Sequence, residues 1–301
     1  MVRLIFSVEL NYEVAPPGCD FILNIHAAHT AHQRVVTEMM ELGQFLLPQV
    51  HTDVLTGNRY MRLKAEPGFL RMRYSATVEI QHHVGVPEAI GEVPVSRLPP
   101  EVLTYLYPSR YCQSDRLYEV ANREFGALPP GYGRARAICD WVEKHVEFKS
   151  NTTNASTSAL DTLSERVGVC RDFAHLMIGL CRALNMPARF VAGIDYGADP
   201  ALGPSDFHAY VEVYLGDRWY LFDPSGTAIP MGLMRFGVGR DAADVSFATI
   251  FGTVRAEAPK ICIHAEEIPH AGIELPRRRA DALSTDGASP MLIGARLTPV
   301  R

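Results

Sequence analysis

The chain has 301 residues and a formal net charge of −5, with 47% hydrophobic and 21% charged residues. This is the composition of an ordinary globular protein, and the length is typical of about two domains. The negative net charge gives no reason to expect nucleic-acid binding. No stretch is apolar enough to cross a membrane, and the first residues lack the sustained apolar run of a signal peptide. We therefore expect a cytoplasmic protein that binds neither nucleic acid nor membranes.

Six scattered cysteines, with no CxxC pair, do not form the pattern of a disulfide-stapled or zinc-binding domain. A disulfide framework is not expected in a cytosolic chain of this size. No second pair of ligands stands at a zinc-like spacing, so we expect neither a metal nor a cofactor. Cys139 and Cys181 lie inside apolar helical patterns, and we expect both to be small core residues.

The first third of the chain has the alternating pattern of β-strands. Strand-like segments run over residues 4–10, 21–27, 34–40 and 69–80, and the composition of residues 34–40 also permits a helix. A hairpin is predicted where Val54-Leu55 and residues 60–63 flank the turn residues Thr56-Gly57-Asn58. Several strands joined by short turns favour an antiparallel β-sandwich over residues 1–95.

After a proline-rich linker at residues 93–100, the pattern changes to helices and then to a second set of strands. The predicted helices cover residues 116–125, 132–145 and 170–184, and the predicted strands cover residues 188–193, 208–215, 218–223 and 260–264. Gly216-Asp217 supplies a tight turn between two of these strands. Beyond Pro269 the composition predicts a loosely attached tail.

The segment most indicative of function places Cys170 between a glycine-containing turn and an apolar helical run. The first N–H groups of a helix lack intrahelical partners, and the helix dipole is positive there. Both effects favour a thiolate over a thiol, so Cys170 is predicted to be a nucleophile.

Two partners for that nucleophile come later in the chain. His208 begins one arm of the predicted hairpin and Asp223 ends the other, so both lie at the same end of it. Asp223 could fix the imidazole tautomer and stabilise the imidazolium, while the other ring nitrogen faces Cys170. The backbone N–H of Cys170 is a natural oxyanion donor, and the polar run at residues 151–158 is a candidate region for a second one.

Each of these residues also has a structural interpretation. Cys170 could be an inert buried thiol, His208 a strand residue bonded to a backbone carbonyl, and Asp223 the start of a turn. These readings weaken because the three residues occur together in the expected order.

Other polar residues near the motifs are weaker candidates. We expect His175 to be structural, because the helix turns it away from the sulfur, and Asp172 to stabilise the first helical turn. Asp206 is a weaker partner for the histidine than Asp223. The loop at residues 195–205 could border a cleft or be a plain surface connection.

The segments GVCRDFA, FHAYVEV and WYLFDPSG resemble the three catalytic motifs of the transglutaminase-like superfamily, and the resemblance covers about residues 100–265. It implies that Cys170, His208 and Asp223 are the catalytic triad. The preceding β-rich region resembles the amino-terminal region of bacterial members. Two departures, Tyr210 in place of a tryptophan and Ser225-Gly226 in place of a threonine-containing sequence, are not expected to touch the reacting groups.

The family resemblance implies an α+β fold with a papain-like, transglutaminase-core catalytic domain behind the β-sandwich-like domain. We assign residues 1–95 to the β-rich domain, 96–268 to the catalytic domain and 269–301 to the tail. The predicted activity is a cysteine acyl transfer that cleaves a peptide, protein or small amide substrate through a thioester acyl-enzyme, with water as acceptor. Two alternatives stay open: a protein-glutamine transglutaminase with an amine acceptor, and a non-catalytic binding or scaffold protein.

Overall fold

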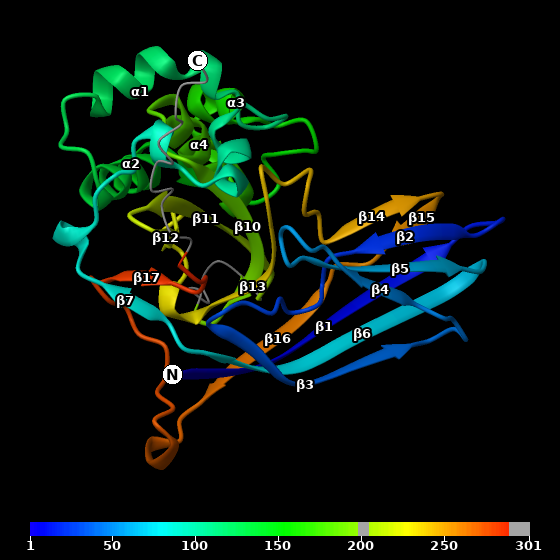
Figure 1. Cartoon of the computed structure of the whole chain (residues 1–301). Coiled ribbons are helices and arrows are strands. Elements are labelled where there is room, and N and C mark those ends of the chain that lie inside the picture. The colour runs from blue at the N-terminus through cyan, green and yellow to red at the C-terminus, as the bar shows by residue number, and fades with distance from the viewer. Residues whose placement is uncertain (198–204, 289–301) are drawn as a thin grey trace, which may run out of the picture.

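The computed structural model describes residues 1–197 and 205–288. A two-layered β part lies beside a part in which helices cover one face of a sheet (Figure 1). The protein is thus a mixed α+β molecule with antiparallel sheets, as the sequence predicts.

The β part consists of two antiparallel sheets. The first contains β1 (Val2–Val14), β6 (Gly68–Ile80), β3 (Gln33–Leu42), β15 (Val254–Ala256) and β16 (Lys260–Glu266). The second contains β14 (Ala248–Phe251), β2 (Cys19–Leu23), β5 (Arg59–Ala65) and β4 (Gln49–Thr52). Along most of β1 every second residue is buried, because alternate side chains of a strand point to opposite faces and one face covers the core.

The predicted hairpin has a different first arm. Strand β4 ends at Thr52, and Val54 and Leu55 are exposed in the turn rather than in a strand. The side chain of Asp53 accepts hydrogen bonds from the backbone N–H groups of Leu55 and Thr56, so the turn begins earlier than the Thr56-Gly57-Asn58 sequence indicates.

The second part is built around one central helix on one sheet. The sheet has the order β12 (Arg218–Phe222), β11 (Phe207–Leu215), β10 (Ala188–Asp195) and β13 (Leu233–Gly239), all antiparallel. Helix α4 (Cys170–Ala183) packs on it and contacts α1 (Tyr118–Phe125), α2 (Tyr132–His145) and α3 (Ala159–Glu165). Every residue from Asp172 to Ala183 is buried, as expected for a helix enclosed on all sides.

Short elements connect these parts. Two small sheets pair β7 (His83–Gly85) with β17 (Ala282–Ser284), and β8 (Glu147–Phe148) with β9 (Val167–Gly168). Among the described residues, 3₁₀ helices cover Pro87–Ala89, Val95–Arg97, Pro100–Leu106, Ser114–Arg116, Pro230–Gly232 and Pro269–Ala271. The predicted proline-rich linker therefore passes through 3₁₀ turns.

The segment after Pro269 is not loosely attached as far as residue 288. Strand β17 pairs with β7, and the Asp286 carboxylate accepts a hydrogen bond from Arg189 at 2.5 Å. The prediction of a loose tail is wrong for this stretch, because an ion pair and a strand pairing hold it. Residues 289–301 lie outside the described part.

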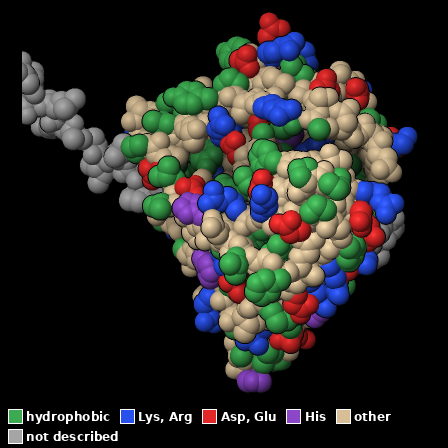
Figure 2. Space-filling view, turned by 90° about the vertical axis from the view of Figure 1, so that its right-hand side faces the viewer, with side chains coloured by type: hydrophobic (Ala, Val, Ile, Leu, Met, Phe, Trp, Pro, Cys, Tyr) green, Lys and Arg blue, Asp and Glu red, His purple; other side chains and the backbone are tan. Residues whose placement is uncertain are grey.

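Strands β14, β15 and β16, within the span assigned to the catalytic domain, pair with β2 and β1 of the β part. The boundaries at residues 95 and 268 stay a prediction. Among the described residues, helices long and apolar enough to span a membrane are absent. On the face drawn in Figure 2, acidic and basic side chains are interspersed.

Candidate active site

The start of helix α4 fixes the position of Cys170, its first residue. Strand β9 ends at Gly168, and the Asp172 carboxylate reaches back to accept the backbone N–H of Val169 at 2.9 Å. A Cβ on Gly168 would lie 2.8 Å from the Cβ of Asp172, so this close approach requires a glycine. Asp172 therefore stabilises the first turn, as expected from its sequence position.

The Cys170 thiol lies next to the strand that carries His208. The Cys170 side chain is half-buried, and its Sγ is 3.9 Å from the backbone oxygen of Phe207, to which it donates. Phe207 is the residue directly before His208 on β11. The structure thus brings the predicted nucleophile to the predicted base.

His208 and Asp223 form a buried pair. Because Val211 on β11 is opposite Phe222 on β12, Asp223, the residue after β12, lies diagonally across from His208. The His208 Nε2 and the Asp223 Oδ1 are 3.3 Å apart, and both side chains are buried. The sequence prediction that these residues share one end of the hairpin agrees with this geometry.

The surroundings of the pair favour charge on both partners. Burial alone would lower the pKa of His208, but the Asp223 carboxylate and the Cys170 side chain outweigh it and raise that pKa well above its usual value. Burial would raise the pKa of the Asp223 carboxyl, but the imidazole and hydrogen bonds hold it below its usual value. Both shifts favour an imidazolium beside a carboxylate.

The Asp223 carboxylate is itself held by the turn that follows it. Its Oδ1 accepts the hydroxyl of Ser225 at 2.6 Å and the backbone N–H of Ser225 at 3.1 Å, and its Oδ2 accepts the backbone N–H of Ala228 at 2.8 Å. The expectation that Ser225 does not touch the reacting groups is therefore wrong. A small hydroxyl residue two positions after an aspartate is the sequence signal for such a turn.

A second carboxylate, which the motifs do not indicate, also faces the imidazole. The Oδ1 of Asp195 lies 3.7 Å from the Nδ1 of His208, and both side chains are buried. The sequence prediction ended this strand at Gly193, whereas β10 continues to Asp195. Residues 198–204 of the predicted cleft loop lie outside the described residues.

The weaker candidates have other roles. Asp206 is exposed, and its carboxylate accepts the backbone N–H of Phe207 at 2.7 Å. His175 is buried, stacks on Tyr111 at 4.9 Å between ring centroids, and accepts the backbone N–H of Ala242, which is the structural role expected for it.

The polar run at residues 151–158 lies against the start of α4. Within it, the backbone oxygen of Asn154 accepts a hydrogen bond from Arg171 at 2.8 Å. A second oxyanion donor from this segment stays a prediction. Cys139 and Cys181 are buried in the helical core, which confirms the expectation for them.

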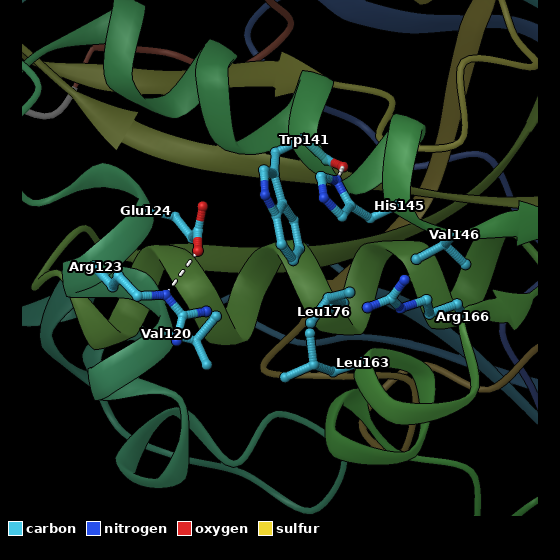
Figure 3. A pocket seen from close by; sticks show the side chains of 9 residues that line it. All are labelled: Val120, Arg123, Glu124, Trp141, His145, Val146, Leu163, Arg166 and Leu176. Carbon is cyan, nitrogen blue, oxygen red and sulfur yellow. Dashed lines mark hydrogen bonds and ion pairs between the residues drawn. The ribbon is translucent and has the colours of Figure 1, made fainter.

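Two cavities lie apart from Cys170, His208 and Asp223. One, of about 340 Å³, is lined by side chains of α1 and α2, the end of α3 and Leu176 of α4. The Trp141 and His145 rings stack along it (Figure 3). The other, of about 360 Å³, is lined in part by Arg189, Trp219 and Arg235. In the described part of the chain, groups of three or more His, Cys, Asp or Glu that could hold a metal are absent.

Comparison with known proteins places both parts of the chain. A model of the bacterial transglutaminase N-terminal domain matches residues 3–101, and a model of the transglutaminase-like superfamily matches residues 119–224. The solved structure of a candidate cysteine protease from Cytophaga hutchinsonii has a TM-score of 0.86 and 36% identity, covering 94% of this chain and 97% of that one. The chain belongs to the transglutaminase-like superfamily. The matched core contains Cys170, His208 and Asp223, and the family supports a cysteine-based catalytic fold.

Two curated relatives of this transglutaminase-like protein are named as uncharacterized proteins. An uncharacterized protein of Mycobacterium leprae is 32% identical over 115 residues, 36% of this chain and 41% of the relative. An uncharacterized protein of Mycobacterium bovis is 26% identical over 170 residues, 53% of this chain and 54% of the relative. The chain therefore spans about two fifths to half of the length of these relatives.

Proposed function

We propose that the protein is a cysteine hydrolase that cleaves peptide or amide bonds through a thioester acyl-enzyme, with Cys170, His208 and Asp223 as its triad. The observation that carries the proposal is the buried His208–Asp223 pair, 3.3 Å apart, beside a cysteine at the first position of a buried helix. A thiol at a helix N-terminus next to an imidazolium is the usual arrangement of an activated cysteine nucleophile.

In the first half-reaction the Cys170 sulfur attacks the carbonyl carbon of the amide. A C–S bond forms, and the tetrahedral oxyanion is stabilised by the backbone N–H at the start of α4. The C–N bond then breaks, and the imidazolium of His208 gives its proton to the departing amine. The thioester and a neutral imidazole remain.

In the second half-reaction His208 takes a proton from water, whose oxygen attacks the thioester carbonyl. The C–S bond breaks, the carboxylic acid leaves, and the thiolate–imidazolium pair is restored. Asp223 keeps the imidazole oriented throughout, because its carboxylate is fixed by Ser225 and Ala228. An amine in place of water would give transamidation by the same steps.

The acyl-enzyme is directly testable. The protein is incubated with a library of peptide amides, with and without an added primary amine, and analysed by intact-protein mass spectrometry after rapid acid quenching. We expect a mass increase on Cys170 equal to the acyl group, and free acid as product.

The Cys170→Ala variant is the control and should show neither the adduct nor turnover while keeping its fold. A product joined to the added amine would favour the transglutaminase alternative. Turnover that persists in the Cys170→Ala variant would overturn the proposal.

A further inference from the structure

The imidazole of His208 has a carboxylate on each side. Asp223 faces Nε2 at 3.3 Å, and Asp195 faces Nδ1 at 3.7 Å. Resting on the function proposed above, we propose that Asp195 is a positioning residue that stabilises the protonated imidazole of His208 from its Nδ1 side. Asp195 is not part of the three motifs that define the triad.

Strand pairing explains how Asp195 reaches the imidazole. Gly193 on β10 is the direct partner of His208 on β11, and Asp195 is two residues further along the same strand. Side chains two residues apart share a face, so Asp195 is the diagonal neighbour of His208. The direct partner is a glycine, so no side chain stands opposite the imidazole on β10.

An irregularity in β10 lies at the same place. The register between β10 and β13 shifts between Ala192 and Gly193, and a Cβ on Gly193 would overlap the backbone oxygen of Met234. Such bulges near active sites re-aim a side chain by bending the strand. Asp195 is the second residue after Gly193. The bend therefore lies where it can direct the Asp195 carboxylate toward His208.

The distance and the burial decide what Asp195 can do. At 3.7 Å the Nδ1 and Oδ1 atoms are too far apart for a good hydrogen bond, so the Asp195 carboxylate acts on the imidazolium through its charge. The two side chains are only 7% and 5% exposed, so solvent screens their attraction weakly. A carboxylate within about 4–6 Å raises the pKa of a cation by roughly one to three units.

Among the described residues, charged groups also lie near His208 on the neighbouring elements. Asp223 lies on the β12 side and the Cys170 side chain on the α4 side, and both favour the imidazolium. On the β13 side, Arg235 is the partner of Gly193, but its guanidinium is engaged by Glu212 and Asp286. Asp195 therefore adds a second negative charge beside the His208 imidazolium. This charge helps His208 to keep its proton until the proton is transferred to the leaving amine.

With the Asp195 carboxylate present, the thiolate–imidazolium pair should persist over a wider pH range. The imidazolium is lost as the pH rises through the pKa of His208, so a carboxylate that raises this pKa moves the alkaline limit of reactivity upward. Replacing Asp195 with asparagine keeps the shape of the side chain and removes the charge. The alkaline limit should then move to lower pH.

The direct test is the titration of His208 by NMR in protein with ¹⁵N-labelled histidine. A Cys170→Ala background removes the coupled titration of the thiol. We expect Asp195→Asn to lower the His208 pKa by about one unit or more, and Asp195→Glu to restore part of the shift. Asp206→Asn is the matched control, because Asp206 carries the same charge two residues before His208 but is exposed, and it should leave the pKa unchanged. An equal His208 pKa with and without the Asp195 charge would overturn the proposal.

Thiol alkylation gives a second readout in protein that retains Cys170. Iodoacetate is an anion, so it reacts fast with a thiolate only while the imidazolium beside it is charged. In Asp195→Asn the alkaline fall of the Cys170 alkylation rate should occur about one pH unit lower than in the wild type.

This experiment separates the two proposals. If Cys170 is activated but its alkylation rate falls at the same alkaline pH in Asp195→Asn as in the wild type, only the proposed role of Asp195 is contradicted. A wild-type Cys170 that reacts like an ordinary surface thiol contradicts the proposed function itself.

Discussion

At the scale of single residues, the site depends on side chains whose hydrogen bonds fix the orientation of other side chains. Asp223 holds His208, and Ser225 holds Asp223 through both its hydroxyl and its backbone N–H. The placement of Cys170 near His208 and Asp223 could be predicted from the order of the three motifs, and their catalytic roles stay a prediction. Ser225 and Asp195 could not be assigned, because their contacts depend on a turn conformation and a strand register that the sequence pattern leaves open.

Neutralising the Asp223 carboxylate should impair the site more than removing the hydroxyl next to it. The Asp223 charge raises the pKa of His208, so in Asp223→Asn the imidazole loses its proton at lower pH, and orientation is lost as well. We expect a decrease in turnover of about 10²–10⁴-fold, as for the loss of a general acid–base group. Ser225→Ala should lower turnover by about 10- to 100-fold, since a hydrogen bond to a charged group is worth roughly 1.5–3 kcal/mol.

The measurement is the rate of product formation across pH for the wild type and both variants. Circular dichroism should show an unchanged fold in each case. Wild-type turnover in Asp223→Asn would reject Asp223 as the orienting group, and a larger loss in Ser225→Ala than in Asp223→Asn would contradict the proposed order of contacts.

At the scale of elements, the junction between β9 and α4 decides where the thiol lies. Helices α1, α2 and α4 follow from apolar periodicity and lie close to their predicted bounds. Helix α3 is only seven residues long, which is too short for a periodic signal, and it was not predicted. The prediction of a hairpin arm at Val54-Leu55 is wrong, because hydrogen bonds to the side chain of Asp53 place these residues in the turn.

A methyl group at Gly168 should disturb this junction. Its Cβ would lie 2.8 Å from the Cβ of Asp172, which is closer than side chains pack, so the first turn of α4 must shift. We expect Gly168→Ala to lower the free energy of unfolding by about 1–3 kcal/mol and to reduce the alkylation rate of Cys170.

Gly133→Ala is the matched control for this prediction. Gly133 lies in α2, with open space where a Cβ would be, so alanine there should keep or raise stability by roughly 1 kcal/mol or less. Urea denaturation of both variants gives the comparison. Equal stabilities of Gly168→Ala and Gly133→Ala would refute the packing argument.

At the scale of the whole molecule, distant segments of the chain complete both parts. Strand β16 pairs with β1 in the first sheet of the β part. The Asp286 carboxylate forms ion pairs with Arg189 and Arg235 of the helix-covered sheet. Composition predicts a loose segment after Pro269, because proline and arginine are frequent there. The long-range pairings that anchor it up to residue 288 have no local sequence signal, so the interleaving of the two parts could not be predicted.

The proposed function requires Cys170 to be an activated nucleophile, and the exposed thiol of Cys262 provides an internal reference for its reactivity. An ordinary thiol has a pKa of ~8.5 and is less than about 1% ionised near pH 6. The most direct measurement is the rate of iodoacetamide labelling of both cysteines at about pH 6, followed by peptide mass spectrometry. We expect Cys170 to be labelled at least about tenfold faster than Cys262, and His208→Ala to remove the difference. Labelling of Cys170 no faster than that of Cys262 would show that Cys170 is not activated.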